Sequence, residues 1–315
     1  MNAGSDGADA DEQDDAARGL SPTAARRRLG ALLRDLRDRA GLTLDQTGQA
    51  MQRSPATMSR LETGKVKPRR LDVVHLLDLY AQQAARAVSE ADRERALVLT
   101  EESRQEAWFS RYRDVLAGSM VNDHARRYME FETDAARIES FQPDLLPGLL
   151  QTRGYIDAIA RNYYPDSTAE QRERFVEFRL RRQQVLRRRE DPLHLHVVLG
   201  EAALRRAPDG PTTMREQLGL LADHVRKGTP NIVVQIAPAA LAIRAVFGGP
   251  FVVMSFTDAE DDDFVFLEGR SGAEYLHSAA YLEQYRQYFD DLTGSALDRD
   301  GSLAMIEEAM TALDR

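Results

Sequence analysis

The sequence predicts a mainly α N-terminal helix-turn-helix bundle, followed by an α+β C-terminal domain with a small sheet. Residues 42–64 carry the start and stop signals of two short helices separated by a tight connection. Further along, four short apolar or β-branched runs are bounded by Pro, Gly and Asp clusters, as strands are. A chain of 315 residues is also too long for one small helical domain, so two domains are expected.

The two short helices are marked by residues that suit helix ends. Thr43 can cap the first helix and Ser54 the second, with Pro55 in the first-turn position, where a missing N–H costs nothing. Gly64 is expected to end the second helix as a left-handed cap. These signals predict two helices short enough to form a helix-turn-helix.

The second short helix is predicted to present a polar face to solvent. Met58 and Leu61 lie on one face, three residues apart, so small polar side chains and an arginine project outward. Two such helices docked at a steep angle are a typical reader of the DNA major groove. We therefore expect double-stranded DNA as a partner. The residues expected at its surface are Thr43, Ser54, Pro55, Ala56, Thr57, Ser59, Arg60, Lys65, Lys67 and Arg69.

Charge is distributed unevenly along the chain. The net charge is −9, yet residues 21–80 hold 12 Lys/Arg and 6 Asp/Glu, while residues 1–20 hold six acids and one arginine. A basic module inside an acidic protein confines the phosphate-attracting surface to one region. The charge pattern therefore favours DNA binding by residues 21–80.

Two further helices are expected to complete the N-terminal bundle. The first runs from Pro22 to about Ala40 and ends at Gly41. The other follows the basic segment at 65–70 and extends to about Tyr80. Its inward residues are expected to be Leu71, Val74 and either Leu76 or Leu77.

Composition divides the chain into four parts. Residues 1–22 have few apolar side chains and read as a disordered acidic tail. The helix-turn-helix domain is expected at 23–80, a helical connector at 81–125 and the C-terminal domain at 126–310. Within that last domain, helices are expected up to residue 189, with a break at 142–148. Later elements are expected as strands at 194–199, 232–236, 251–256 and 264–267, and as helices at 212–226, 272–292 and 302–313.

Several function classes find no support in the sequence. Without cysteine, disulfides, zinc fingers and thiol catalysis are excluded. No phosphate-binding loop, nucleophile elbow or metalloprotease motif is present, so we expect no enzyme and no cofactor. Glu201 and Glu268 could pair as catalytic carboxylates, but no partner set accompanies them. His194 and His196 share one strand face without a third ligand, so no metal site is expected.

No segment approaches the roughly 18–20 apolar residues that span a bilayer, and the N-terminus is acidic where a secretory signal is basic and then apolar. We therefore expect a cytoplasmic protein without a membrane partner.

Residues 25–80 resemble the phage Cro/repressor class of helix-turn-helix, known as the XRE type. The resemblance rests on Gly41, Ser54, the run Met58-Ser59-Arg60-Leu61-Glu62, and Gly64-Lys65. It implies that Arg37 pairs with Glu62, that Ala56, Thr57, Ser59 and Arg60 face bases, and that Arg69 lies near the minor groove. Departures from the family pattern are Thr47 for leucine, Gly48 for alanine, and Pro55 and Ala56 where some relatives carry glutamines.

Residues 126–310 resemble the domain of unresolved function that follows such modules in WhiJ-like regulators of high-GC bacteria, some of them described as toxin–antitoxin-like. The resemblance implies a very small acidic protein as a partner. The matching positions are Glu132, Ala135, the run 146–152, Tyr155, Arg182, Gln183, the run 201–205, Pro230, Asn231, Phe251, Leu267 and Glu268.

The stretch 172–189 holds eight arginines against Glu173 and Glu177. One interpretation is a solvated helix with i,i+4 ion pairs. A second is a docking strip for the acidic partner, with aromatic anchors, and a third is nonspecific contact with DNA. The partner-binding residues under the second interpretation are Phe175, Phe178, Arg181, Arg182 and Arg188. The run 147–152 also has two interpretations, a ligand cradle or a turn whose Leu149 and Leu150 enter the core.

Taken together, these features predict a sequence-specific DNA-binding transcriptional regulator that binds a palindromic operator as a homodimer. Its C-terminal domain would bind a small partner protein or another signal. The alternative is an antitoxin-like protein that sequesters a small partner and autoregulates its own operon.

Overall fold

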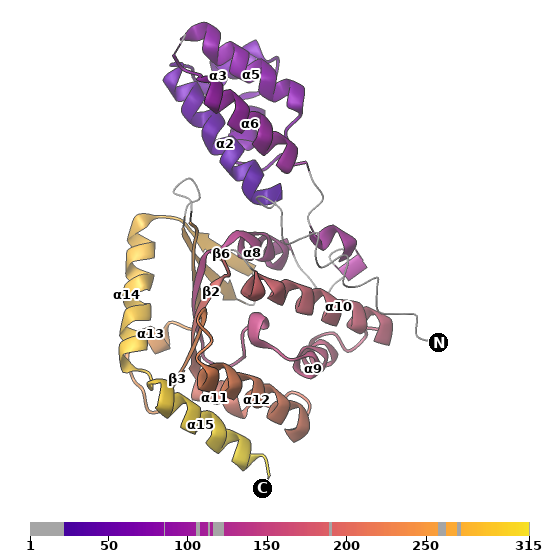
Figure 1. Cartoon of the computed structure of the whole chain (residues 1–315), viewed down its shortest axis with the longest axis vertical. Coiled ribbons are helices and arrows are strands. Elements are labelled where there is room, and N and C mark those ends of the chain that lie inside the picture. The colour runs from indigo at the N-terminus through magenta and orange to yellow at the C-terminus, as the bar shows by residue number, and fades with distance from the viewer. Residues whose placement is uncertain are drawn as a thin grey trace. The chain divides into compact units, whose positions relative to one another are not determined.

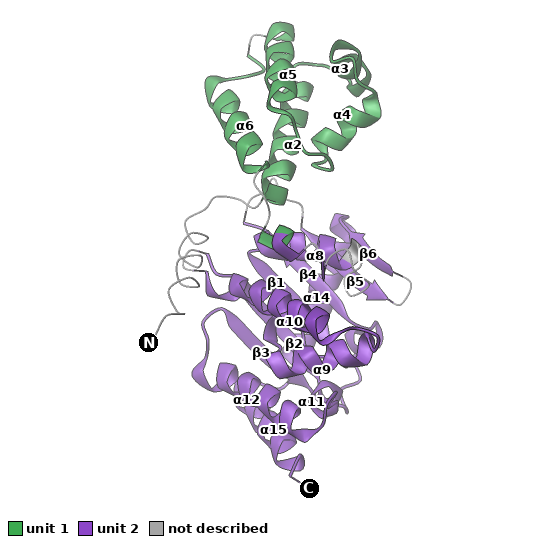
Figure 2. Ribbon diagram, turned by 90° about the vertical axis from the view of Figure 1, so that its right-hand side faces the viewer, with its two compact units in different colours: residues 1–110, 258–261 green, residues 111–257, 262–315 purple. Residues whose placement is uncertain are grey.

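The computed structural model describes residues 22–84, 86–104, 108–112, 114–115, 123–188, 191–257, 263–269 and 272–314. The predicted acidic tail therefore lies almost wholly outside the described residues. The chain divides into two compact units, residues 1–110 with 258–261 and residues 111–257 with 262–315 (Figure 2).

The first unit is a bundle of short helices around one apolar core. Its helices are α2 (Pro22–Arg39), α3 (Leu44–Ala50), α4 (Pro55–Glu62), α5 (Arg70–Gln83) and α6 (Glu90–Glu102). Leu29, Leu32, Leu33 and Leu36 of α2 are buried, and Met58 and Leu61 of α4 pack against them. The helix-turn-helix is therefore α3 and α4, held on a scaffold of α2, α5 and α6.

Two expectations for the first unit need correction. Leu71 is 71% exposed, and the buried side of α5 is formed by Val73, Leu76, Leu77 and Tyr80. These positions follow the i, i+3, i+4, i+7 pattern of one helix face, which Leu71 does not share. In addition, α6 is not a simple connector, because its Ala96 and Leu99 complete the core of the first unit.

The second unit is built on one six-stranded sheet. Its strands are β1 (Arg137–Gln142), β2 (His194–Gly200), β3 (Ile232–Ala237), β4 (Phe251–Ser255), β5 (Phe264–Gly269) and β6 (Gly272–Leu276). The order is β3-β2-β1-β4-β5-β6, with β1, β2 and β3 parallel and β4, β5 and β6 antiparallel to their neighbours. The α+β class and all four expected strands are confirmed.

Two strands occupy segments that the sequence predicted as helical. β1 lies at the centre of the sheet, between β2 and β4. Pairing on both sides decides its state, and no local sequence window contains that information. β6 pairs with β5 across a short connection, so the predicted helix at 272–292 begins later, as α14 (Ala279–Ser295).

Helices cover both faces of the sheet, as Figure 1 shows for α14 on one side and α9, α10 and α12 on the other. The remaining helices of the second unit are α8 (Asp123–Asp134), α9 (Arg153–Tyr163), α10 (Ala169–Arg182), α11 (Glu201–Arg205), α12 (Pro211–Lys227), α13 (Arg244–Phe247) and α15 (Arg299–Ala312). Phe289 and Leu292 of α14 form one core with Phe141, whereas α12 and α15 share the opposite core with Ile138. Ile138 and Phe141 of β1 therefore point to opposite faces of the sheet and belong to two separate apolar cores.

Candidate nucleic-acid interface

Helix α3 begins at a capping box. The Thr43 hydroxyl accepts a hydrogen bond from the Gln46 N–H at 3.2 Å, and the Gln46 side chain accepts one from the Thr43 N–H at 2.9 Å. Both side chains are exposed. The reciprocal bonds satisfy two backbone donors that a helix N-terminus otherwise leaves open.

Helix α4 begins at Ser54, whose hydroxyl accepts from the Thr57 N–H at 3.2 Å, with Pro55 in the first turn. The Ser54 and Thr57 hydroxyls lie 2.9 Å apart, and the Arg60 guanidinium makes a long contact of 3.5 Å with the Thr57 hydroxyl. These contacts join the cap of α4 to Arg60 along one exposed edge.

The exposed face of α4 contains the residues expected to face bases. Ala56 and Arg60 are exposed, and Thr57 and Ser59 are half-buried. Met58 on the other face is only 4% exposed, so the helix has one face for the core and one for solvent.

Helix α4 ends in a Schellman motif around Gly64, which has a φ of +65°. The Gly64 N–H donates to the Leu61 carbonyl at 3.1 Å and the Lys65 N–H to the Arg60 carbonyl at 2.9 Å. A Cβ added to Gly64 would lie 3.0 Å from the Arg27 Cα, so this position needs glycine for space as well as for conformation. The turn therefore directs the chain from α4 closely past α2.

A buried ion pair joins α2 to α4. Arg37 donates from Nε to Glu62 Oε1 at 2.7 Å and from Nη2 to Glu62 Oε2 at 3.1 Å. The Arg37 side chain is 11% exposed and that of Glu62 5%. The hydrogen bond to Glu62 raises the pKa of Arg37 above its ordinary value. Arg37 also donates to the Leu42 carbonyl at 2.7 Å. The same side chain therefore holds the segment that leads into α3.

The segment after α4 supplies an exposed cationic surface. Lys65, Lys67 and Arg69 are exposed. Lys65 and Arg69 form no ion pair with the described acidic residues, whereas Lys67 donates to the Arg104 carbonyl at 2.8 Å. Cations of this kind, next to an exposed polar helix, suit the phosphate backbone of DNA.

Two arginines beside this surface were not selected from the sequence. Arg53 lies in the turn between α3 and α4, 3.9 Å from Asp72, and Arg70 lies at the first position of α5, 2.9 Å from Glu101. Both are exposed. Both lie in the basic module within three residues of a helix end. This feature of the sequence could have identified them as candidates for DNA contact.

The residues predicted as a partner-binding strip are mostly used inside the second unit. Phe175 and Phe178 are each 1% exposed, so they belong to the core and offer no surface anchor. Arg188 donates to the Thr133 carbonyl, and Arg181 is half-buried. The prediction was wrong for the two phenylalanines because an arginine-rich helix can still bury one apolar face.

Arg182 is the clearest case of internal use. Its Nε donates to Glu132 Oε1 at 2.6 Å and its Nη2 to Glu132 Oε2 at 3.1 Å. Glu132 is 1% exposed; burial raises the pKa of its carboxyl, and the Arg182 charge opposes that rise. The pair fastens α10 to α8, and the Arg182 side chain is only 13% exposed.

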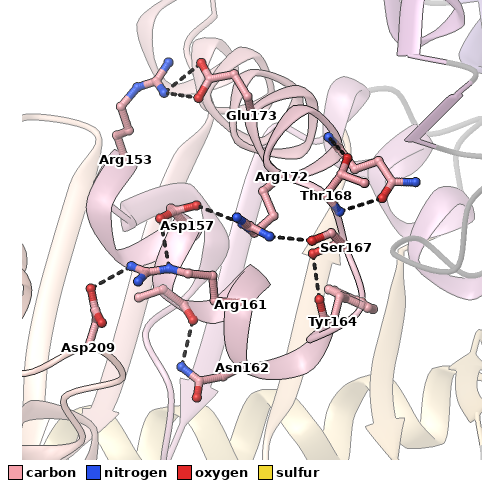
Figure 3. Close-up of polar contacts among 12 residues, drawn as sticks. Arg153, Asp157, Arg161, Asn162, Tyr164, Ser167, Thr168, Arg172, Glu173 and Asp209 are labelled. Atoms are coloured by element: carbon pink, nitrogen blue, oxygen red, sulfur yellow. Dashed lines mark hydrogen bonds and ion pairs between the residues drawn. The ribbon is translucent and has the colours of Figure 1, made fainter.

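Most arginines at the junction of α9 and α10 are also paired, as Figure 3 shows. Arg153 contacts Glu173 at 2.8 Å, and Arg172 lies 3.8 Å from Asp157 while donating to the Ser167 carbonyl. The interpretation of a helix surface with internal ion pairs thus describes this junction. Arg189 lies outside the described residues.

The run 147–152 forms a turn held by glutamine side chains. Gln183 donates to the Gly148 and Gln151 carbonyls at 3.0 and 2.7 Å, and Gln217 donates to the Leu150 carbonyl at 2.7 Å. Leu149 and Leu150 are 5% and 1% exposed. The turn-into-core interpretation therefore describes Leu149 and Leu150.

Glu201 and His196, which the sequence offered for catalysis and for metal binding, have structural partners, whereas Glu268 and His194 are exposed. Glu201 accepts from the Ala239 N–H at 2.9 Å, a bond that lowers the pKa of its carboxyl, and it pairs with Arg205 at 2.7 Å. His196 Nε2 lies 2.8 Å from Gln235 Oε1. Among the described residues, no group of three His, Asp or Glu side chains is arranged to hold a metal ion.

A short capped helix pair with one exposed polar helix and flanking cations defines the helix-turn-helix class of DNA-binding regulators. Residues 28–89 match a family model described as a helix-turn-helix domain, and residues 125–308 match one described as Domain of unknown function (DUF5753). The second match covers more than half of the chain, so the chain belongs to the DUF5753 family. Comparison with curated proteins and with solved structures gave no match.

No described helix is both long enough and apolar enough to cross a membrane.

Proposed function

We propose that this protein is a sequence-specific transcriptional regulator of the XRE type that reads the major groove with α4. The observation that carries the proposal is the exposed face of α4, where Arg60 stands beside Thr57 on a capped helix. Lys65 and Arg69 follow it and have no acidic partner among the described residues. Arginine at such a position reads guanine by two hydrogen bonds, and the flanking cations meet phosphate.

The protein acts as a homodimer on a palindromic operator. One α4 reads only a few base pairs, so two copies related by a twofold axis would read half-sites about one helical turn, roughly 34–36 Å, apart. Specific affinity at physiological salt generally requires the larger contact surface that a dimer supplies.

Selection of bound duplexes from a random pool tests this proposal directly. Recovery of a palindromic sequence with half-sites about 10–10.5 base pairs apart is expected. Recovery of an asymmetric sequence would contradict the dimer, and failure to enrich any sequence would contradict sequence-specific reading.

The second unit regulates the first by contact with a small partner protein and performs no catalysis. Its exposed aromatic side chains support protein contact, because aromatic residues are common binding anchors. Phe247 of α13 is 78% exposed and Tyr281 of α14 is 47% exposed. They replace Phe175 and Phe178 as the anchors of the proposed contact.

The antitoxin-like alternative assigns the same contact a different role, sequestration of the small protein. Purification of the full chain together with the product of any small adjacent gene tests the contact. Stable capture that Phe247→Asp abolishes supports it, with Val233→Asp as a control because Val233 is an exposed aliphatic side chain on β3, 45% exposed. Release of DNA on capture would favour the regulator, whereas capture without any effect on DNA would favour sequestration.

A further inference from the structure

The basic segment beside α4 is tied to the end of α6. The Lys67 ammonium donates to the Arg104 carbonyl at 2.8 Å, and Arg70 Nη1 lies 2.9 Å from Glu101 Oε1. The two contacts join residues that are 37 and 31 positions apart in the chain. The Arg70 and Glu101 side chains are 50% and 57% exposed, so the tie lies on the surface.

The end of α6 attracts cations for two reasons. The last carbonyls of a helix lack intrahelical donors, and the C-terminus carries partial negative charge. Here two glutamates, Glu101 and Glu102, add full negative charge to that last turn. Lys67 donates to the carbonyl of Arg104, two residues beyond the last residue of α6, and Arg70 pairs with Glu101 in the last turn.

The inner side of the same turn is anchored. Leu99 is 4% exposed, Ser103 is fully buried, and the Ser103 hydroxyl donates to the Thr100 carbonyl at 2.6 Å. The core thus holds α6 up to Ser103, whereas the contacts of Glu101 and Arg104 with the basic segment are on the surface. Exposed contacts exchange easily with other partners.

We propose that the end of α6 and the DNA backbone compete for Lys67 and Arg70. This inference rests on the proposed DNA-binding function and adds its regulation. When the two cations turn to phosphate, the Arg104 carbonyl and the Glu101 carboxylate lose their partners. Glu101 then also repels the nearby phosphates, so the last turn of α6 opposes DNA binding.

The competition acts in both directions. Any change that holds the end of α6 in its present contacts lowers DNA affinity, and DNA binding loosens those contacts by the same free energy. Arg104 is followed after three residues by Trp108, and the second unit begins at residue 111. The end of α6 is therefore where an event in the second unit would reach the DNA-binding surface through the chain.

A pair of matched variants measures the competition. Glu101→Gln removes the acceptor of Arg70, while Glu94→Gln removes the same charge from an exposed position of α6 whose side chain pairs with none of the described residues. Binding of the full chain to a fluorescein-labelled duplex of mixed sequence is followed by anisotropy at low salt, where phosphate contacts dominate. We expect Glu101→Gln to bind several-fold more tightly than Glu94→Gln.

The outcomes separate this inference from the function on which it rests. Equal affinities of the two variants overturn the competition and leave DNA binding intact. A wild-type chain that binds no duplex at any salt concentration overturns the DNA-binding function and the competition together.

Trp108 reports whether the effect travels along the chain, because it is the one tryptophan in the sequence. We expect its emission to change on saturation with the same duplex, and to change less in Glu101→Gln than in Glu94→Gln. Emission that stays constant in every variant overturns the transmission towards the second unit.

Discussion

Arg37 of α2 and Glu62 of α4 form a two-point ion pair, with Nε–Oε1 and Nη2–Oε2 distances of 2.7 and 3.1 Å. Glu62 is the last residue of the helix that is proposed to read DNA, and Arg37 lies in the last turn of the scaffold helix. Two parallel hydrogen bonds restrict rotation as well as distance. The pair thus sets the orientation of α4 relative to α2.

Removing Arg37 should destabilise the first unit strongly. Arg37→Ala leaves the Glu62 carboxylate buried without its partner, which costs roughly 3–5 kcal/mol in such settings. Arg34→Ala is the matched control, because Arg34 lies 3.9 Å from the same carboxylate and its side chain is 52% exposed. We expect the control to cost at most about 1 kcal/mol. Urea unfolding of the full chain measures both values, and equal losses would refute the role of the buried pair.

The glycines that end α2 and α4 should differ in their tolerance of alanine. Gly41 and Gly64 have φ values of +70° and +65°, so alanine costs about 1–2 kcal/mol at each through backbone strain. A Cβ added at Gly64 would lie 3.0 Å from the Arg27 Cα, whereas a Cβ added at Gly41 would have no atom within 4 Å. We expect Gly64→Ala to lower the unfolding midpoint more than Gly41→Ala does. The reverse order would contradict the close passage of the chain past α2.

The local signals of the first unit predicted its structure well, because helix caps act over three or four residues. Thr43, Ser54 and Gly64 each end or begin a helix as expected. The surface that these caps define could therefore be located from the sequence.

The structure of the second unit was harder to predict, because the contacts that determine it join residues far apart in the sequence. Arg182 pairs with Glu132 across 50 residues, and this contact turns an apparent surface charge into an internal one. β1 depends in the same way on pairing with β2, since its Ile138 lies opposite Leu195. Charge density and local periodicity contain neither fact.

Arg60 should determine one base pair in each half-site. A bidentate contact of arginine with guanine discriminates by about 1–3 kcal/mol. Arg60→Ala should therefore relax the preference at that position in a selection experiment and leave the other positions unchanged. An unaltered preferred sequence and affinity would show that α4 is not the reading helix.

Lys65 should contribute affinity without specificity. It is exposed, directly follows Gly64 and has no acidic partner among the described residues, as expected for a phosphate contact. Lys65→Ala should weaken binding to all duplexes equally and reduce the slope of log affinity against log salt by about 0.9. A change confined to one sequence would instead assign Lys65 to base reading.

His196 should make the second unit sensitive to acid. The Gln235 amide nitrogen donates to the Thr293 and Leu297 carbonyls at 3.2 and 3.1 Å, so its oxygen accepts from His196 Nε2. Burial lowers the pKa of His196; Gln235 and Glu139 oppose that shift, Arg137 adds to it, and the Phe289 ring packs against the imidazole at 5.0 Å.

A lowered folded-state pKa means that the unfolded chain takes up the proton first. The stability contributed by neutral His196 is therefore complete above the ordinary histidine value of about 6.5 and is lost as the pH falls through the lower folded-state value. His196→Gln keeps a donor to Gln235 and cannot titrate, so it should flatten the decline of the urea midpoint between about pH 8 and pH 5. His194→Gln, on the same strand face but exposed, should leave the decline in place. A decline that is unchanged in His196→Gln would contradict this role of the buried imidazole.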